Sequence, residues 1–171
     1  LHYFSRADSI LKLAETYTTD DMYLARFYET KGLYFYELQQ YDSALVYFKK
    51  GLPLWQHEEY RLYSYMKIMQ VYLDMDSLAQ ALPYAQSIIH NTQNPTFLVN
   101  AYYCMMQDAN DKNDTKRLSE YSHARADAEK SLRDYVSISA ETVPKFSEYL
   151  SNPHPLRWVW ILISCIIGIC L

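Results

Sequence analysis

Two clusters of residues resemble metal-binding or catalytic motifs, but each lacks residues that its motif requires. A stretch at 108–114 is rich in Asp and Asn, like a calcium loop, but it lacks the central glycine and terminal glutamate of an EF-hand. His57 precedes Glu58 and Glu59, but no second histidine follows four residues later, as zinc proteases require. We interpret 108–114 as a solvated loop ending in an N-cap at Asp114, and the glutamates as first-turn charges.

No serine, cysteine or lysine has a recognisable activating partner nearby in the sequence, so catalysis has no support. We therefore predict that the protein is not an enzyme, and we predict no metal site and no cofactor. What the sequence offers in place of a reactive centre is aromatic side chains, with 18 tyrosines and six phenylalanines in 171 residues.

The amino-acid composition limits which folds and which binding partners are plausible. Three glycines are too few for the turns of an all-β sandwich, so helices are expected. Sixteen Lys and Arg against 20 Asp and Glu give a net charge of −4, and the basic residues form no cluster longer than two. This charge pattern excludes nucleic acid as a partner of this segment.

A period of 37 residues organises the chain. Four apolar columns repeat at this step: Phe4, Tyr41 and Leu78; Ala7, Ala44 and Ala81; Leu11, Phe48 and Ala85; Ala14, Gly51 and Ile88. Within each copy the spacing is i, i+3, i+7 and i+10, which is one face of an amphipathic helix. These segments are therefore the second helices of repeated helix pairs.

The first helices precede them. Tyr28, Gly32 and Phe35 recur 37 residues later as Tyr65, Met69 and Tyr72, again at helical spacing. Short polar breaks at 39–40 and 74–76 predict antiparallel hairpins. Asp20-Asp21 and Asn94-Pro95 are start signals for first helices.

The last pair is predicted to be atypical. Aligning Leu118 with Leu78 requires a step of 40 and places Tyr121 where the alanine column stood. Its final helix is expected to begin near Thr115 and end near Thr142, before Pro144. In the second pair, Pro83 is expected to bend its helix because it lacks an N–H.

The segment 32–52, GLYFYELQQYDSALVYFKKGL, resembles the tetratricopeptide repeat, with Gly32, Tyr41, Ala44 and Phe48 at the characteristic positions. The second copy is weaker, because Met69 replaces the glycine, although Leu78 and Ala81 agree. The period exceeds the family's 34 by three residues, which fall at 53–60. The expected packing residues are Phe4, Ala7, Gly32, Tyr41, Ala44, Phe48, Leu78 and Ala81.

The resemblance implies an all-α protein in which antiparallel hairpins stack as a right-handed solenoid over 1–142. Its parts would be the second helix of a truncated repeat at 1–18, repeats at 20–54 and 57–91, and an atypical repeat at 95–142. The concave groove would be lined by Arg26, Glu29, Leu33, Tyr36, Tyr63, Met66 and Gln70. These residues lack the Lys and Asn of repeats that clamp peptide carboxylates, so an aromatic and aliphatic groove for a protein or peptide is expected.

Tyr36 and Tyr63 are the best candidates for ligand contact, because aromatic side chains are favoured at interfaces. The alternative is that the tyrosines are large core residues between helices, and we consider that interpretation the better one for most of them.

The carboxyl-terminal sequence indicates a membrane anchor. A linker is expected at 143–155, followed by a truncated transmembrane helix at 156–171. Sixteen helical residues span about 24 Å, less than a hydrocarbon core of about 30 Å. Arg157, Trp158 and Trp160 are typical of a membrane interface. Because the segment is short and the first helix lacks a partner, we expect a fragment cut at both ends.

Two functions fit these features. The first is a single-pass, membrane-anchored binding module whose repeats lie outside the cytoplasm, in the periplasm; such an array resembles the sensory part of bacterial membrane regulators. A homodimer is possible in that arrangement. The second is a tail-anchored scaffold of a membrane complex. A basic stretch and a second domain after Leu171 would favour the regulator, whereas a stop codon there would favour the scaffold.

Overall fold

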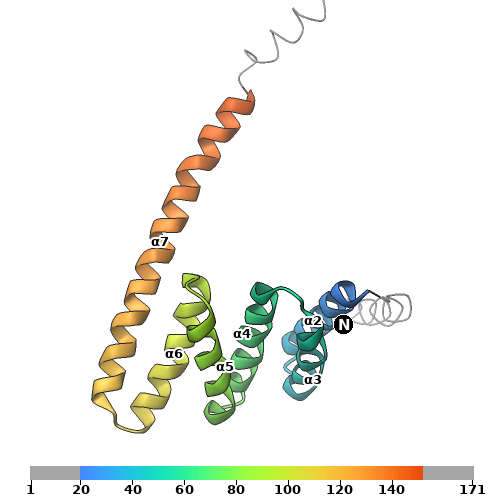
Figure 1. The fold of residues 1–171 in the computed structure, drawn as a ribbon, viewed down its shortest axis with the longest axis vertical. Coiled ribbons are helices and arrows are strands. Elements are labelled where there is room, and N and C mark those ends of the chain that lie inside the picture. The colour runs from blue at the N-terminus through green and yellow to red at the C-terminus, as the bar shows by residue number, and fades with distance from the viewer. Residues whose placement is uncertain (1–19, 152–171) are drawn as a thin grey trace, which may run out of the picture. The chain divides into compact units, whose positions relative to one another are not determined.

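The computed structural model describes the backbone of residues 20–151 and the side chains of residues 20–137. This part is all-helical, with six α-helices, one 3-10 turn and no strand. The elements are α2 (Asp21–Glu37), α3 (Tyr41–Gly51), η1 (Leu52–Leu54), α4 (Glu58–Asp74), α5 (Leu78–Asn91), α6 (Pro95–Asp111) and α7 (Thr115–Ser151) (Figure 1). The expected all-α class is confirmed.

Polar caps begin the first helices of two pairs where the sequence predicted them. The Asp20 side chain accepts a hydrogen bond from the Met22 N–H at 2.8 Å and so starts α2. The Asn94 side chain accepts from the Thr96 N–H at 3.0 Å, with Pro95 as the first helical residue of α6. Each cap supplies an acceptor to N–H groups that have no partner within the helix.

Three turns of the same geometry follow the first helices. Gln39, Asp76 and Asn113 all have positive φ, between 54° and 57°. The next residue in each turn donates its N–H to the carbonyl five residues back, at 2.8 to 2.9 Å, which is the Schellman arrangement. The chain therefore reverses direction within three residues of each helix end.

These turns also correct the prediction for the last pair. The positive-φ residues lie 37 residues apart, and the helices that follow begin at Tyr41, Leu78 and Thr115, again 37 apart. The residue equivalent to Leu78 is therefore Thr115, and the step of 40 that aligned Leu118 with it was wrong. The alignment was wrong because Leu118 is a large apolar residue, whereas the equivalent positions in the first two pairs hold the small residues Ala44 and Ala81.

The core lies between the two helices of each pair and between neighbouring pairs. Helix α2 packs on α3 and α4 packs on α5, while α5 also packs on α6 (Figure 1). Ala44 and Ala81 are fully buried, and Phe48 is buried beside Ala44. Tyr41 and Leu78 pack against the two core clusters as partly buried residues. Phe4 and Ala7 lie outside the described residues.

Gly32 allows α2 to lie close against the Phe48 ring of α3. A Cβ atom at this position would lie 2.6 Å from the ring of Phe48, which is well inside van der Waals contact. Because Phe48 is itself buried, its ring cannot swing into solvent to make room. Gly32 is thus required by packing and not by backbone conformation.

The extra residues between the first two pairs form a short connection that holds a tryptophan. Turn η1 contains Pro53, and the chain then places Trp55 in the interior with only 3% of its surface exposed. The indole Nε1–H of Trp55 donates to the Ser64 hydroxyl at 3.0 Å. This buried hydrogen bond fixes the connection against α4.

The chain divides into two units, residues 1–129 and 130–171, and helix α7 contributes to both. In the first unit Tyr121 of α7 stacks on Tyr102 of α6, with ring centroids 6.3 Å apart. The Arg125 guanidinium lies over the Tyr103 ring at 5.2 Å. The first turns of α7 therefore complete the third pair.

The predicted end of this last helix was wrong. Helix α7 continues past Thr142 and through Pro144 to Ser151, so residues 143–151 of the expected linker are helical. A proline within a helix removes one N–H donor, and in a helix of 37 residues the remaining bonds maintain the structure. Asn152 to Leu171, with Arg157, Trp158 and Trp160, lie outside the described residues.

Within the described residues, no helix combines the length and apolar character needed to cross a membrane. Pro83 lies inside α5, which runs without interruption from Leu78 to Asn91. The bend expected at Pro83 stays a prediction.

Candidate functional site

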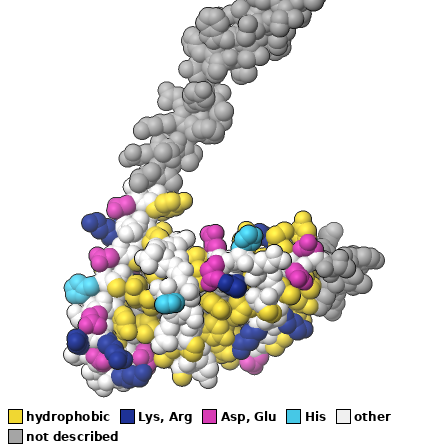
Figure 2. Space-filling model, in the orientation of Figure 1, with side chains coloured by type: hydrophobic (Ala, Val, Ile, Leu, Met, Phe, Trp, Pro, Cys, Tyr) yellow, Lys and Arg dark blue, Asp and Glu magenta, His cyan; other side chains and the backbone are white. Residues whose placement is uncertain are grey.

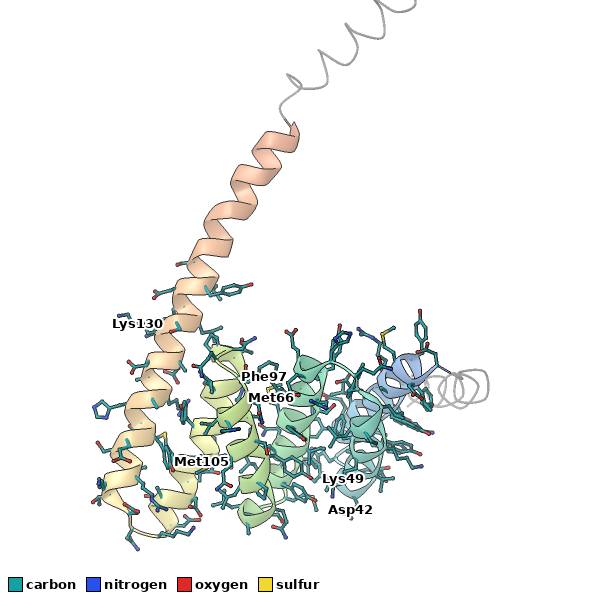
Figure 3. All side chains as sticks on the ribbon, viewed as in Figure 1. Asp42, Lys49, Met66, Phe97, Met105 and Lys130 are labelled. Atoms are coloured by element: carbon teal, nitrogen blue, oxygen red, sulfur yellow. The ribbon has the colours of Figure 1, made fainter. Side chains whose placement is uncertain are left out.

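A pocket of about 430 Å³ opens between the first helices of the three pairs. Helix α2 lines it with Arg26, Glu29, Thr30 and Leu33, helix α4 with Glu59, Tyr60 and Tyr63, and helix α6 with Phe97. Phe97 of α6 and Met66 of α4 are labelled next to each other in Figure 3, and Met66 packs against the core cluster that contains Phe97. We call this space the first-helix pocket.

Four of the seven residues predicted to line a groove line this pocket: Arg26, Glu29, Leu33 and Tyr63. The other three lie elsewhere on the same helices. Met66 accepts a hydrogen bond from the Asn100 amide at an N–S distance of 3.8 Å, and Tyr36 and Gln70 meet at Asp74. The predicted set therefore divides into four pocket residues, the polar cluster of Tyr36 and Gln70, and Met66, which belongs to neither.

Arg26 is held in place at one wall of the pocket by two aromatic rings. Its guanidinium carbon lies 5.2 Å from the centre of the Tyr60 ring and 5.8 Å from that of Trp55. Its Nη2 also donates to the Tyr60 hydroxyl at 3.3 Å. Cation–π contacts of this kind hold the guanidinium against the aromatic wall of the pocket.

Glu29 is the pocket residue with a buried polar atom that has no hydrogen bond within the described part of the chain. Its Oε1 atom is buried and has no hydrogen-bond partner among the described residues. Burial raises the pKa of this carboxyl, and the positive charges of Arg26 and Lys67 oppose the rise. A desolvated carboxylate oxygen without a donor is unfavourable, so a ligand that donates a hydrogen bond would be stabilised here.

Lys67 lies near the pocket without lining it. Its ammonium is 5.1 Å from the centre of the Tyr63 ring. Tyr63 thus receives a cation in the same way as Tyr60, and the pocket contains two rings that have electron-rich faces next to a carboxylate.

Tyr36, Gln70 and Asp74 form a polar cluster near the carboxyl-terminal ends of α2 and α4, and they hydrogen-bond to one another. The Tyr36 hydroxyl donates to Asp74 Oδ2 at 2.6 Å, and the Gln70 amide donates to Asp74 Oδ1 at 2.9 Å. Burial and this hydrogen bond to Asp74 raise the pKa of Tyr36 above its usual value. Tyr36 is therefore committed to a partner within the protein, whereas Tyr63 faces the pocket.

Many other tyrosines pack between helices, in agreement with the alternative interpretation. Tyr47 of α3 stacks on Phe35 of α2 with centroids 5.3 Å apart, and Tyr84 of α5 stacks on Tyr72 of α4 at 6.1 Å. Hydrophobic side chains cover much of the face shown in Figure 2, and acidic and basic side chains are interspersed there. The aromatic residues thus serve mainly to join helices.

The remaining candidates have structural roles. The loop predicted at 108–114 was wrong in its first part, because α6 continues to Asp111 and only 112–114 form the turn. Lys112 pairs with Asp108 at 2.7 Å, and Asp114 accepts from the Arg117 N–H at 3.0 Å, so Asp114 caps α7. Burial raises the pKa of the Cys104 thiol to about 11. No group of three or more His, Cys, Asp or Glu within the described part of the chain could hold a metal ion.

Sequence reasoning missed Trp55, Tyr60 and Phe97. Trp55 and Tyr60 lie at 53–60, where three residues exceed the family's period, and an insertion beside a groove is a signal that could have indicated them. Phe97 follows the Asn94-Pro95 start of α6 and lies in the first turn, where its side chain reaches α4.

The chain matches no protein-family model, no curated protein and no solved structure.

Proposed function

We propose that the protein is a binding module that recognises a protein or peptide in the first-helix pocket. The observation that carries the proposal is the pocket itself, which aromatic rings line together with Glu29, a carboxylate that has one buried oxygen without a donor. Binding sites of this kind combine apolar walls with a few placed polar groups. A peptide offers both apolar side chains and N–H donors to such a site.

The proposal includes a tetratricopeptide-like arrangement in which the hairpins stack as a right-handed solenoid. Three turns spaced at 37 residues, the contact of Gly32 with Phe48, and the buried alanines at 44 and 81 support it. Repeat arrays place the same face of successive units side by side and so form extended binding surfaces.

The proposal also includes a single-pass membrane anchor at 156–171, supported by its apolar sequence and by Arg157, Trp158 and Trp160. The module would lie outside the cytoplasm, as the sensory part of a signalling or transcription-regulating protein. A tail-anchored scaffold is the second candidate. An alkali-resistant membrane fraction for the 171-residue chain, lost when 156–171 are deleted, would support the anchor, and the gene sequence after Leu171 separates the two functions.

The binding proposal is tested by selecting peptides from a random display library on the 171-residue chain. The blocking variant is Thr30→Trp, because Thr30 is an exposed pocket residue and an indole there fills the pocket without removing core contacts. We expect the selected peptides to bind this variant at least about tenfold more weakly, which is the effect of losing 1.4 kcal/mol.

The matched control is Tyr23→Trp, which places the same indole on α2 at a residue that is 61% exposed and does not line the pocket. It should bind the selected peptides as the unmodified chain does. A library that yields no binding peptide, or peptides that bind the blocking variant equally well, would contradict the proposed function.

A further inference from the structure

We propose that the first-helix pocket receives a lysine or arginine side chain of the bound peptide, with the ligand cation paired to Glu29. This inference rests on the proposed function and specifies its ligand. It follows from the unpaired oxygen of Glu29, the charges of the residues that line the pocket, and the aromatic rings that line it.

The buried oxygen of Glu29 requires a donor. Oε1 of Glu29 is excluded from solvent and has no hydrogen-bond partner among the described residues. Hydrogen bonds to a charged acceptor are roughly twice as strong as neutral ones, so a ligand that donates to the Glu29 carboxylate from the pocket gains the most from it. An ammonium or guanidinium group donates and also neutralises the charge.

The charges that line the pocket favour a cation. Glu29 and Glu59 both line it, and Arg26 is its only basic lining residue within the described part. Arg26 is engaged with Tyr60 and Trp55 on the wall. An acidic peptide would meet two carboxylates, whereas a cationic one would add to the partial compensation that Arg26 and Lys67 give to the charge of Glu29.

The aromatic walls suit the same ligand. Tyr60 and Tyr63 already receive cations of the protein, Arg26 and Lys67, at 5.2 and 5.1 Å from the ring centres. The apolar stem of a lysine or arginine can pack on Leu33 and Phe97, which also line the pocket. Long basic side chains are the natural ligands that combine an apolar stem with a charged donor.

Lys67 gives the proposal a second, opposite test. Its charge acts on Glu29 without a hydrogen bond to Oε1, so it competes with a ligand cation for the same carboxylate. Removing the Lys67 charge should therefore strengthen binding of a basic peptide. An acidic ligand would show the reverse response.

The test measures binding of four acetylated and amidated peptides, Ala-Ala-Xaa-Ala-Ala, to the 171-residue chain by NMR titration. Xaa is lysine, arginine, norleucine or glutamate, and norleucine matches the lysine stem without its charge. We expect the lysine and arginine peptides to bind at least about tenfold more tightly than the norleucine peptide, as expected for a charged hydrogen bond. The glutamate peptide should bind most weakly.

Three variants assign the effect to Glu29. Glu29→Gln should abolish the preference for lysine over norleucine, and Lys67→Met should increase it several-fold. Glu37→Gln is the matched control, because it removes the same charge from an exposed residue of the same helix and should leave the preference unchanged. Circular dichroism of each variant verifies that the helices are retained.

Each outcome bears on one of the two proposals. A norleucine or glutamate peptide that binds as tightly as the lysine peptide, or a preference that survives Glu29→Gln, would overturn the cation site and leave peptide binding intact. Binding of none of these peptides, together with an empty library selection, would overturn both proposals.

Discussion

The first two helix pairs place residues of opposite size at the same two positions. In the α2–α3 pair, Gly32 faces the ring of Phe48. In the α4–α5 pair, the residues 37 positions later are Met69 and Ala85, which are fully buried in one core cluster. The large side chain comes from the second helix in one pair and from the first helix in the other.

This difference explains why the second copy is the weaker match in sequence. A search for a small residue in the first helix finds Met69 and counts it as a departure. Interiors are packed to a nearly constant density, so the combined volume at a contact matters more than the residue at either position. The loss of the glycine in the second pair is balanced by the loss of the large aromatic residue opposite it.

The comparison predicts a large effect for Gly32→Met, which gives the first pair the methionine of the second while Phe48 remains. The added side chain has no room, because a Cβ alone would lie 2.6 Å from the Phe48 ring. We expect a loss of about 3 kcal/mol in the free energy of unfolding, the upper part of the usual range for overpacking. Chemical denaturation of the 171-residue chain measures it.

The double variant Gly32→Met with Phe48→Ala reproduces the second pair in the first. It should be more stable than either single variant, since Phe48→Ala alone leaves a cavity that costs about 3 to 5 kcal/mol. A double variant whose loss equals the sum of the two single losses would show that these positions are not coupled, and the size exchange would be refuted.

The next effect concerns a position where the two pairs are alike. Ala44 and Ala81 are fully buried and lie 37 residues apart, so Ala44→Leu and Ala81→Leu should each lower the free energy of unfolding by about 1 to 3 kcal/mol. Ala79→Leu, at an exposed residue of α5, is the control and should change stability little. Unequal behaviour of the two buried alanines would argue against a shared column.

Much of the helical pattern could be predicted from the sequence because it depends on local signals. The caps at Asp20 and Asn94 and the polar breaks after the first helices each require only neighbouring residues. The end of α7 could not be placed in this way. Pro144 is a strong local stop signal, but it does not prevent the helix from continuing to Ser151.

The site was predicted less completely because its geometry depends on contacts between distant residues. The resemblance to the tetratricopeptide repeat indicated Arg26, Glu29, Leu33 and Tyr63 as residues of one groove, and these four line the pocket. It could not show that Tyr36 bonds to Asp74, 38 residues away, and so is occupied. Nor could it show that Trp55, in a connection without helical spacing, holds Arg26 against the wall.

The smallest predicted effect is a gain in stability and not a loss. It distinguishes the pocket residue Glu29 from the core residues discussed above. Glu29 lies among groups that do not satisfy Oε1, and burial raises its pKa above the usual value of 4.5. The folded state then binds this proton more tightly than the unfolded state does, so the contribution of Glu29 to stability falls as the pH rises through the usual and raised pKa values.

Glu29→Gln removes the buried charge that destabilises the folded state, so this variant should melt slightly higher than the unmodified chain at pH 7. The difference should vanish below the usual pKa, where Glu29 is protonated in both states. Thermal melts of Glu29→Gln and Glu37→Gln from pH 3 to pH 8 measure this, and a Glu29→Gln variant that melts lower at pH 7 would mean that Glu29 stabilises the fold and is not held for a ligand.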